Sequence, residues 1–196
     1  MNLLTTGRSF LAHALVLVTV AGFTGCGANA PFVDEKLDPV TSVTIRYSNP
    51  HLVFFRNVAG HTAFARDYVD LAPVEINRSG DRRYYIWLGI WTDAGGAAGR
   101  DEFKSVNVFA DSEPLQLQLS GWTSAAIGAS EPVYKKPAAS AVDAYYEVTV
   151  DQLQRMANAT DLRLETGGRE RETFEPWDDQ TRGKTALLEF LKGSTY

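Results

Sequence analysis

Cysteine is nearly absent from this chain, because Cys26 is the only one among 196 residues. A single cysteine excludes an intramolecular disulfide framework and a zinc site built from several cysteines. Basic residues are also in the minority, since 19 Lys and Arg against 24 Asp and Glu give a net charge of −5. Such a chain lacks the excess of cations that neutralises a phosphate backbone. We therefore expect no nucleic-acid partner, no metal and no cofactor.

The sequence motifs of common enzyme classes are missing as well. No G-x-S-x-G, H-E-x-x-H, G-x-x-x-x-G-K-[ST] or C-x-x-C arrangement occurs. Beyond the first 25 residues the histidines are His51 and His61, each directly after a proline or a glycine. The glycine-rich stretch 95–100 opens no helical pattern, which indicates a hairpin loop rather than a phosphate-binding loop. We predict surface loop histidines, no catalytic residue and no enzymatic activity.

The N-terminal residues 1–25 combine one charged side chain, Arg8, with a complete lack of acidic residues. An apolar run, FLAHALVLVTVAGF, occupies positions 10–23. As a helix this run would span only ~21 Å, which is short of the ~30 Å hydrocarbon core of a bilayer. These features predict a secretory signal peptide rather than a membrane-spanning helix.

The four residues Phe23-Thr24-Gly25-Cys26 resemble the lipobox of bacterial lipoproteins, although Phe23 and Thr24 depart from the commonest residues at their positions. The resemblance implies cleavage before Cys26, a diacylglycerol on its sulfur and an acylated amino group. It also implies an outer-membrane location, because Gly27 replaces the Asp that favours inner-membrane retention in enteric lipoproteins. Two lipid groups anchor a protein stably, whereas one does not. The rest of the chain weakly resembles uncharacterised proteobacterial envelope lipoproteins.

Two alternatives to lipid attachment stay open. A conventional signal peptidase would cut after the A-x-A sequence at 28–30 and release a soluble periplasmic protein, although a proline then follows the cut. Cys26 would otherwise be a small buried apolar residue, as free cysteines often are. Neither alternative explains why the single cysteine follows the apolar run directly.

The remainder of the chain divides into a short tether and one domain. Residues 26–40 are small, polar and interrupted by Pro31 and Pro39, which predicts a flexible tether of up to ~45 Å. From residue 41 onward, apolar and polar residues alternate with the period of two that is typical of half-buried strands. We therefore predict a single β-rich domain over 41–196. The segments with this period are 41–47, 52–57, 68–76, 83–92, 105–110, 115–119, 144–150, 162–166 and 169–174.

Two segments carry helical signals instead. Thr149 and Gln152 have the spacing of a capping box before a short helix at 151–158, and a second helix is predicted at 178–192. Residues 123–142 have no periodicity and predict a long loop that covers an end of the sheet. The expected fold is mainly β: an antiparallel β-sandwich or rolled sheet of about eight strands, with a short helix and a C-terminal helix.

The most aromatic strand, at 83–92, places two kinds of side chain on its two faces. Ile86, Leu88 and Ile90 share one face and are the natural core row. The opposite row contains Tyr85, Trp87 and Trp91, either packed under the C-terminal helix or exposed as an aromatic strip. In the second case, Tyr85, Trp87 and Trp91 are candidate ligand-binding residues for a sugar or a peptide.

These observations lead to three functional hypotheses. The first is a non-catalytic outer-membrane lipoprotein that acts as a binding or structural module facing the periplasm or the cell surface. Its partners would be the membrane, through the lipid on Cys26, and an envelope protein or glycan. The alternative is a carbohydrate- or peptidoglycan-binding module that uses the aromatic sheet face. The third is a hydrolase with an unrecognised site.

Overall fold

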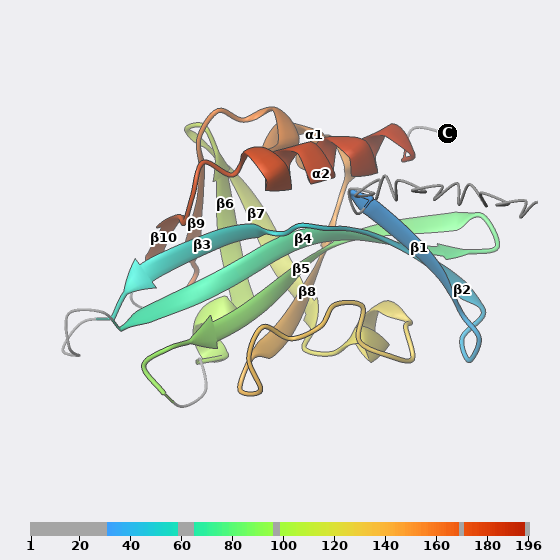
Figure 1. The fold of residues 1–196 in the computed structure, drawn as a ribbon, viewed down its shortest axis with the longest axis horizontal. Coiled ribbons are helices and arrows are strands. Elements are labelled where there is room, and N and C mark those ends of the chain that lie inside the picture. Colours follow the sequence, from blue (N-terminus) through green and yellow to red (C-terminus); the bar gives the residue numbers. More distant parts are fainter. Residues whose placement is uncertain (1–30, 59–64, 96–98, 169–170, 195–196) are drawn as a thin grey trace, which may run out of the picture. The chain divides into compact units, whose positions relative to one another are not determined.

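The computed structural model describes residues 31–58, 65–95, 99–168 and 171–194 (Figure 1). The predicted signal peptide, Cys26 and His61 lie outside these residues. The described chain is mainly β, with 48% strand and 19% helix.

Eight antiparallel strands close into a barrel. Around the ring the order is β4-β3-β10-β9-β6-β7-β8-β5, and the pairing of β4 with β5 joins its two ends. The strands are β3 (Leu52–Asn57), β4 (Arg66–Arg78), β5 (Asp81–Thr92), β6 (Ser105–Ala110), β7 (Glu113–Gly121), β8 (Val142–Val148), β9 (Leu162–Thr166) and β10 (Thr173–Pro176).

The barrel corrects the predicted sandwich. In a sandwich, two separate sheets keep open edges, whereas here each of the eight strands has a partner on both sides. The long hairpin of β4 and β5 makes the closing contact, with 12 residue pairs in continuous register from Asp67–Thr92 to Arg78–Asp81. A sequence pattern cannot separate the two folds, because inward and outward side chains alternate along a strand in both.

A second hairpin, β1 (Val33–Asp38) with β2 (Val43–Ser48), extends the sheet beyond the ring. Strand β2 pairs with the second half of β4, while β3 pairs with the first half. Strand β1 therefore corrects the predicted tether over 26–40, of which 33–38 are part of the sheet. Its sequence, VDEKLD, lacks apolar alternation because β1 is an edge strand that buries few side chains.

The two helices, α1 (Val150–Asn158) and α2 (Thr181–Lys192), lie side by side across one end of the barrel (Figure 1). The predicted capping box is present, with Thr149 accepting from the backbone of Gln152 and the Gln152 side chain accepting from the backbone of Thr149. The helices bury apolar side chains over the barrel interior: Leu153, Met156, Leu187, Phe190 and Leu191. None of the helices among the described residues is long and apolar enough to span a membrane.

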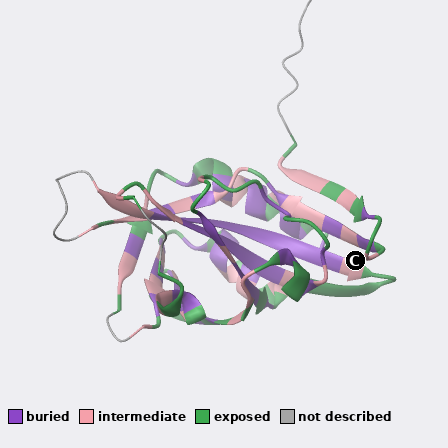
Figure 2. Ribbon diagram, turned by 90° about the horizontal axis from the view of Figure 1, so that it is seen from below, coloured by how far each residue is buried: buried purple, intermediate pink, exposed green. Residues whose placement is uncertain are grey.

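A second apolar cluster lies outside the barrel wall. Residues 122–141, which we call the cover segment, lie over the outer face of β2, β4, β5 and β8, with Ile127, Val133 and Tyr134 buried there. The loop predicted over 123–142 was expected to cover an end of the sheet, and the cover segment lies over a face instead. Residue 142 belongs to β8. Buried positions consequently occur on both sides of the central strands, as Figure 2 shows for the long strands.

Candidate functional site

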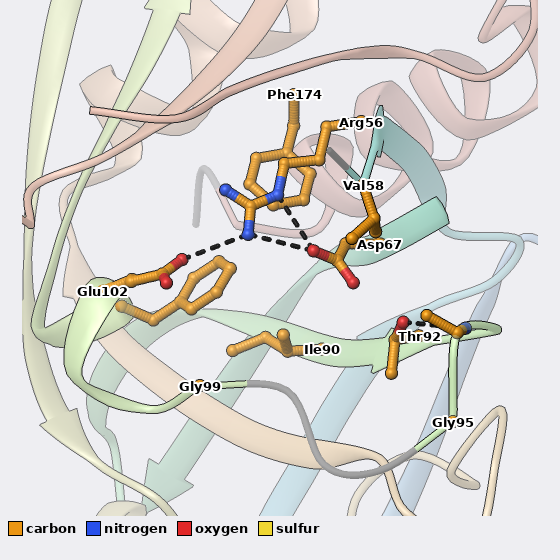
Figure 3. A pocket seen from close by; sticks show the side chains of 11 residues that line it. Arg56, Val58, Asp67, Ile90, Thr92, Gly95, Gly99, Glu102 and Phe174 are labelled. Atoms are coloured by element: carbon orange, nitrogen blue, oxygen red, sulfur yellow. Dashed lines mark hydrogen bonds and ion pairs between the residues drawn. The ribbon is translucent and has the colours of Figure 1, made fainter. Parts of the chain in front are cut away.

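The end of the barrel away from the helices contains a cavity of about 190 Å³. Its lining includes three buried apolar side chains, Ile90, Phe103 and Phe174, and the charged side chains of Arg56, Asp67 and Glu102. Figure 3 shows Arg56 next to Phe174, with Asp67 and Glu102 on its two sides. We call this cavity the barrel mouth. The described residues 94, 95 and 99 complete one side of it.

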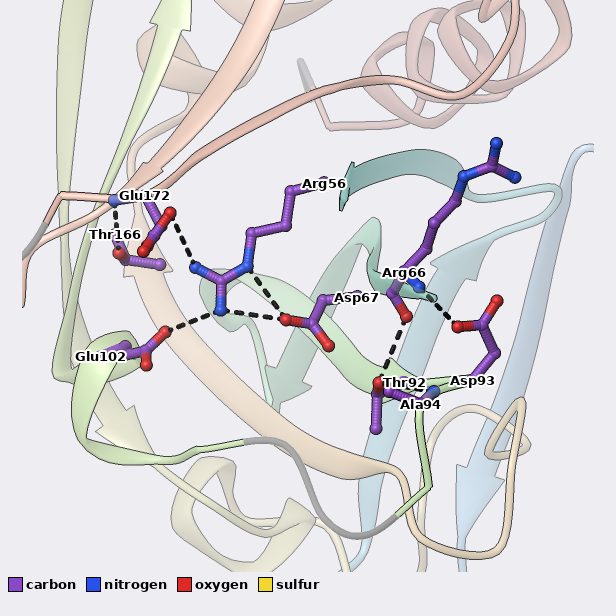
Figure 4. A network of polar contacts seen from close by, with 9 residues as sticks. All are labelled: Arg56, Arg66, Asp67, Thr92, Asp93, Ala94, Glu102, Thr166 and Glu172. Atoms are coloured by element: carbon purple, nitrogen blue, oxygen red, sulfur yellow. Dashed lines mark hydrogen bonds and ion pairs between the residues drawn. The ribbon is translucent and has the colours of Figure 1, made fainter. Parts of the chain in front are cut away.

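Arg56 is the central group of the barrel mouth, and three carboxylates surround it (Figure 4). Its Nε donates to Asp67 Oδ2 at 3.0 Å, and its Nη2 lies 2.9 Å from the same oxygen. Glu102 lies 3.4 Å from Nη2, and Glu172 lies 3.1 Å from Nη1. The guanidinium also lies over the ring of Phe174, 5.0 Å from its centre.

The ion pairs of Arg56 support a structural role in holding the barrel strands together more than a role in catalysis. Arg56 already has carboxylate partners on both terminal nitrogens, so it has little capacity left for a substrate anion. The described lining contains no histidine, cysteine or serine that would serve as nucleophile or base. Thr92 Oγ1 donates to the backbone carbonyl of Arg66, so this hydroxyl also has a structural partner.

The cover segment buries two residues of the predicted aromatic row on β5, Tyr85 and Trp87, and leaves the third, Trp91, uncovered. Trp87 has no exposed surface and Tyr85 is 5% exposed, so neither offers a face to a ligand. The Trp87 ring packs on Tyr134 of the cover segment at 4.4 Å, and its Nε1 donates to Asp143 at 3.0 Å. The candidate ligand-binding role of these two residues is therefore corrected. Both side chains are packed rather than exposed, which is one of the two predicted alternatives. They pack under the cover segment, however, and not under the C-terminal helix. The opposite row, Ile86, Leu88 and Ile90, faces the barrel interior as predicted.

Trp91 lies beyond the cover segment and belongs to a different aromatic group. Its ring stacks on Tyr68 with centres 4.1 Å apart and planes 11° apart. Tyr68 in turn contacts the edge of Trp177 at 5.5 Å, and Trp177 contacts Phe55 at 5.3 Å. Trp177 is 46% exposed, Phe55 and Trp91 are partly buried, and Tyr68 is buried among them. We call Phe55, Tyr68, Trp91 and Trp177 the aromatic surface.

Polar groups border the aromatic surface. Trp91 Nε1 donates to Asp70 Oδ1 at 3.4 Å, and the other oxygen of Asp70 lies 3.6 Å from Nδ1 of His51. His51 is not the surface loop histidine that we predicted, because its ring packs edge-on against Trp87 and Tyr134. A His–Asp pair is two thirds of a catalytic triad. However, no hydroxyl or thiol in the described part of the chain is hydrogen-bonded to His51.

Sequence reasoning found Trp91 and missed its neighbours. Phe55 and Tyr68 lie opposite each other on β3 and β4, and Tyr68 lies opposite Trp91 on β5. Both residues lie in predicted strands, 52–57 and 68–76, but the pairing of these strands with each other and with β5 was not predicted. Trp177 joins from the segment after β10, which no local pattern connects to β5.

Other kinds of site find little support in the described ranges. No group of three or more His, Cys, Asp or Glu side chains among those residues is arranged to hold a metal ion. The lipid attachment predicted at Cys26 lies outside the described residues. Comparisons of the chain with protein-family models, with curated proteins and with solved structures found no match.

Proposed function

We propose that this protein is a non-catalytic binding module of the bacterial cell envelope, held at the outer membrane by lipid on Cys26, and that it binds carbohydrate on the aromatic surface. The observation that carries the proposal is the exposure of Trp177, 46%, in ring contact with Phe55 and Tyr68. The lipobox-like residues 23–26 support the location.

The chemistry of the aromatic surface favours a sugar over a purely apolar ligand. Aromatic rings present flat apolar faces, and the C–H groups on one face of a pyranose can pack against them. The guanidinium of Arg66, which lies over the rings of Trp177 and Phe55, places N–H donors beside them, and such donors suit the hydroxyl groups of a sugar. Tyr68 is fixed beneath the other rings, so the surface is already formed and little side-chain freedom is lost on binding.

The binding proposal is tested by titrating the full chain with muropeptides and with neutral oligosaccharides while following tryptophan fluorescence. We expect Trp177→Ala and Trp91→Ala each to weaken binding at least tenfold. Leu188→Ala is the matched control, because Leu188 is 41% exposed on α2 and outside the aromatic surface. Unchanged affinity in Trp177→Ala would overturn the assignment of the surface.

The anchoring proposal is tested by intact mass of the membrane-extracted protein beside a Cys26→Ser variant. We expect a mass equal to residues 26–196 plus a diacylglyceryl and an acyl group. In the variant both the added mass and the membrane association should be lost. A soluble chain that begins after residue 30 would replace the anchored protein with a periplasmic one, and binding by the aromatic surface would still be open to test.

A further inference from the structure

Arg66 supplies a positive charge at the aromatic surface and has no acidic partner there. Its guanidinium carbon lies 5.1 Å from the ring centre of Trp177 and 5.4 Å from that of Phe55. Its Nε is buried without a hydrogen-bond partner. No carboxylate of the described residues forms a salt bridge with this guanidinium. The charge is therefore oriented by the two rings and left uncompensated.

The neighbouring acidic residue, Asp93, is engaged elsewhere. Asp93 accepts from the backbone N–H of Arg66 at 2.5 Å and from the Tyr68 hydroxyl at 3.5 Å. Figure 4 shows the Arg66 side chain extending away from Asp93, with no interaction drawn to its terminal nitrogens. Arg56 differs from Arg66 in this respect. It lies one residue before Asn57, which pairs with Arg66, and it has three carboxylate partners.

An unpaired guanidinium beside exposed rings is suited to a carboxylate on the ligand. Arginine presents parallel N–H donors that match the two oxygens of a carboxylate, and such charge-assisted bonds are stronger than neutral ones. The ring contacts fix the guanidinium plane without using those donors. The net charge of −5 repels anions at long range, so an acidic ligand would need this direct ion pair to bind.

We infer that the ligand of the aromatic surface is an acidic carbohydrate, whose sugar ring packs on Trp177 and whose carboxylate pairs with Arg66. This inference rests on the proposed carbohydrate binding and adds the class of sugar. Arg66 is then the residue that determines specificity, while Trp177 provides contact area to acidic and neutral sugars alike.

The test compares an oligogalacturonate with the same oligosaccharide after its carboxyl groups have been reduced to alcohols, at one fixed salt concentration. We expect the full chain to bind the acidic form at least tenfold more tightly. Arg66→Gln should remove this preference, so that the ratio of the two affinities falls to about one. Arg66→Lys should keep part of the preference, because it retains the charge but not the planar donors.

Two variants separate the outcomes. Trp177→Ala should weaken binding of both forms, and Arg78→Gln, an exposed arginine at the other end of β4, should change neither. Equal binding of the acidic and neutral forms by the unaltered chain would overturn the acidic-sugar inference and keep the proposed function. A preference that survives Arg66→Gln would overturn the role of Arg66. Binding of neither form would contradict the proposed function itself.

Discussion

The indole ring of Trp87 occupies the space above Gly89, two residues further along β5. A Cβ added at position 89 would lie 2.5 Å and 2.6 Å from two carbons of that ring. The ring cannot move outward, because Tyr134 of the cover segment packs on it at 4.4 Å and Asp143 holds its Nε1. A glycine at position 89 is therefore a packing requirement of the covered outer face.

Gly89→Ala should destabilise the protein by roughly 1 to 3 kcal/mol, the usual cost of forcing an extra carbon into a packed region. Equilibrium urea unfolding measures the change. Gly99→Ala is the control, because the nearest side-chain atom to a Cβ there is 3.6 Å away. Equal stabilities of the two variants would show that Trp87 has room to shift.

Arg56→Met should destabilise the protein by about 2 kcal/mol, because Asp67, which is mostly buried, loses its cation. Glu102 and Glu172 are about 40% exposed and add less. The thermal unfolding midpoint and the urea midpoint should both fall. Lys104→Gln, which breaks only an exposed pair with Asp101 in the same region, should change stability by less than about 0.5 kcal/mol. If Arg56→Met leaves both midpoints unchanged, the three carboxylates move into solvent when the cation is removed.

Asp38 connects the cover segment to the β1–β2 turn, and this connection should depend on pH. The backbone N–H of Ser130, the Ser130 hydroxyl and two turn N–H groups donate to its carboxylate, and they lower its pKa below the usual 3.8. A lowered folded-state pKa stabilises the protein above about pH 4, and that stability is lost as the pH falls through the folded value. The stability gap between the protein and Asp38→Asn should be full at pH 7 and smaller at pH 3. A gap of constant size in urea unfolding would contradict the role of the charge.

Tryptophan exposure provides a direct check of the two aromatic groups. Trp87 is fully buried and Trp177 is 46% exposed, so Trp177→Phe should remove much of the fluorescence that acrylamide quenches. Trp87→Phe should remove mainly unquenched, blue-shifted emission. If acrylamide quenching falls more in Trp87→Phe than in Trp177→Phe, the cover segment does not protect the outer face in solution.

Buried tyrosines should make the fold sensitive to high pH. Burial raises the pKa of Tyr134, Tyr145 and Tyr146 above the usual 10. The unfolded chain ionises these groups near pH 10 while the folded chain does not, so stability is complete below pH 10 and decreases above it. Absorbance at 295 nm should show these residues titrating only together with the loss of far-UV circular dichroism. Their titration before unfolding would contradict the burial.

Local patterns predicted most elements of the fold. The strands at 52–57, 105–110 and 162–166 match β3, β6 and β9 to the residue, and the capping box at Thr149 places α1. Closure of the barrel could not be predicted, because it depends on which distant strands pair. Strand β1 was not predicted, because an exposed edge strand lacks the alternation of apolar and polar residues on which strand prediction depends.

The candidate site was less predictable than the fold. Trp91 was selected because it stands in an aromatic strand, and Trp87 and Tyr85 were selected by the same argument. The cover segment buries Trp87 and Tyr85 and leaves Trp91 uncovered. Its position could not be predicted, because residues 123–142 have no periodicity. The partners of Trp91 come from β3, β4 and the segment after β10, so the aromatic surface is a product of tertiary structure.

Because the sheet begins at β1, few residues separate the folded domain from Cys26. Strand β1 begins at Val33, seven residues after Cys26, and seven residues span at most roughly 25 Å when fully extended. On a chain anchored at Cys26, this short segment would keep the barrel close to the lipid headgroups, so it would bind only ligands near the membrane surface. A glycan in a more distant layer would have to approach the membrane, and an insertion before residue 33 would widen the zone that the barrel can search.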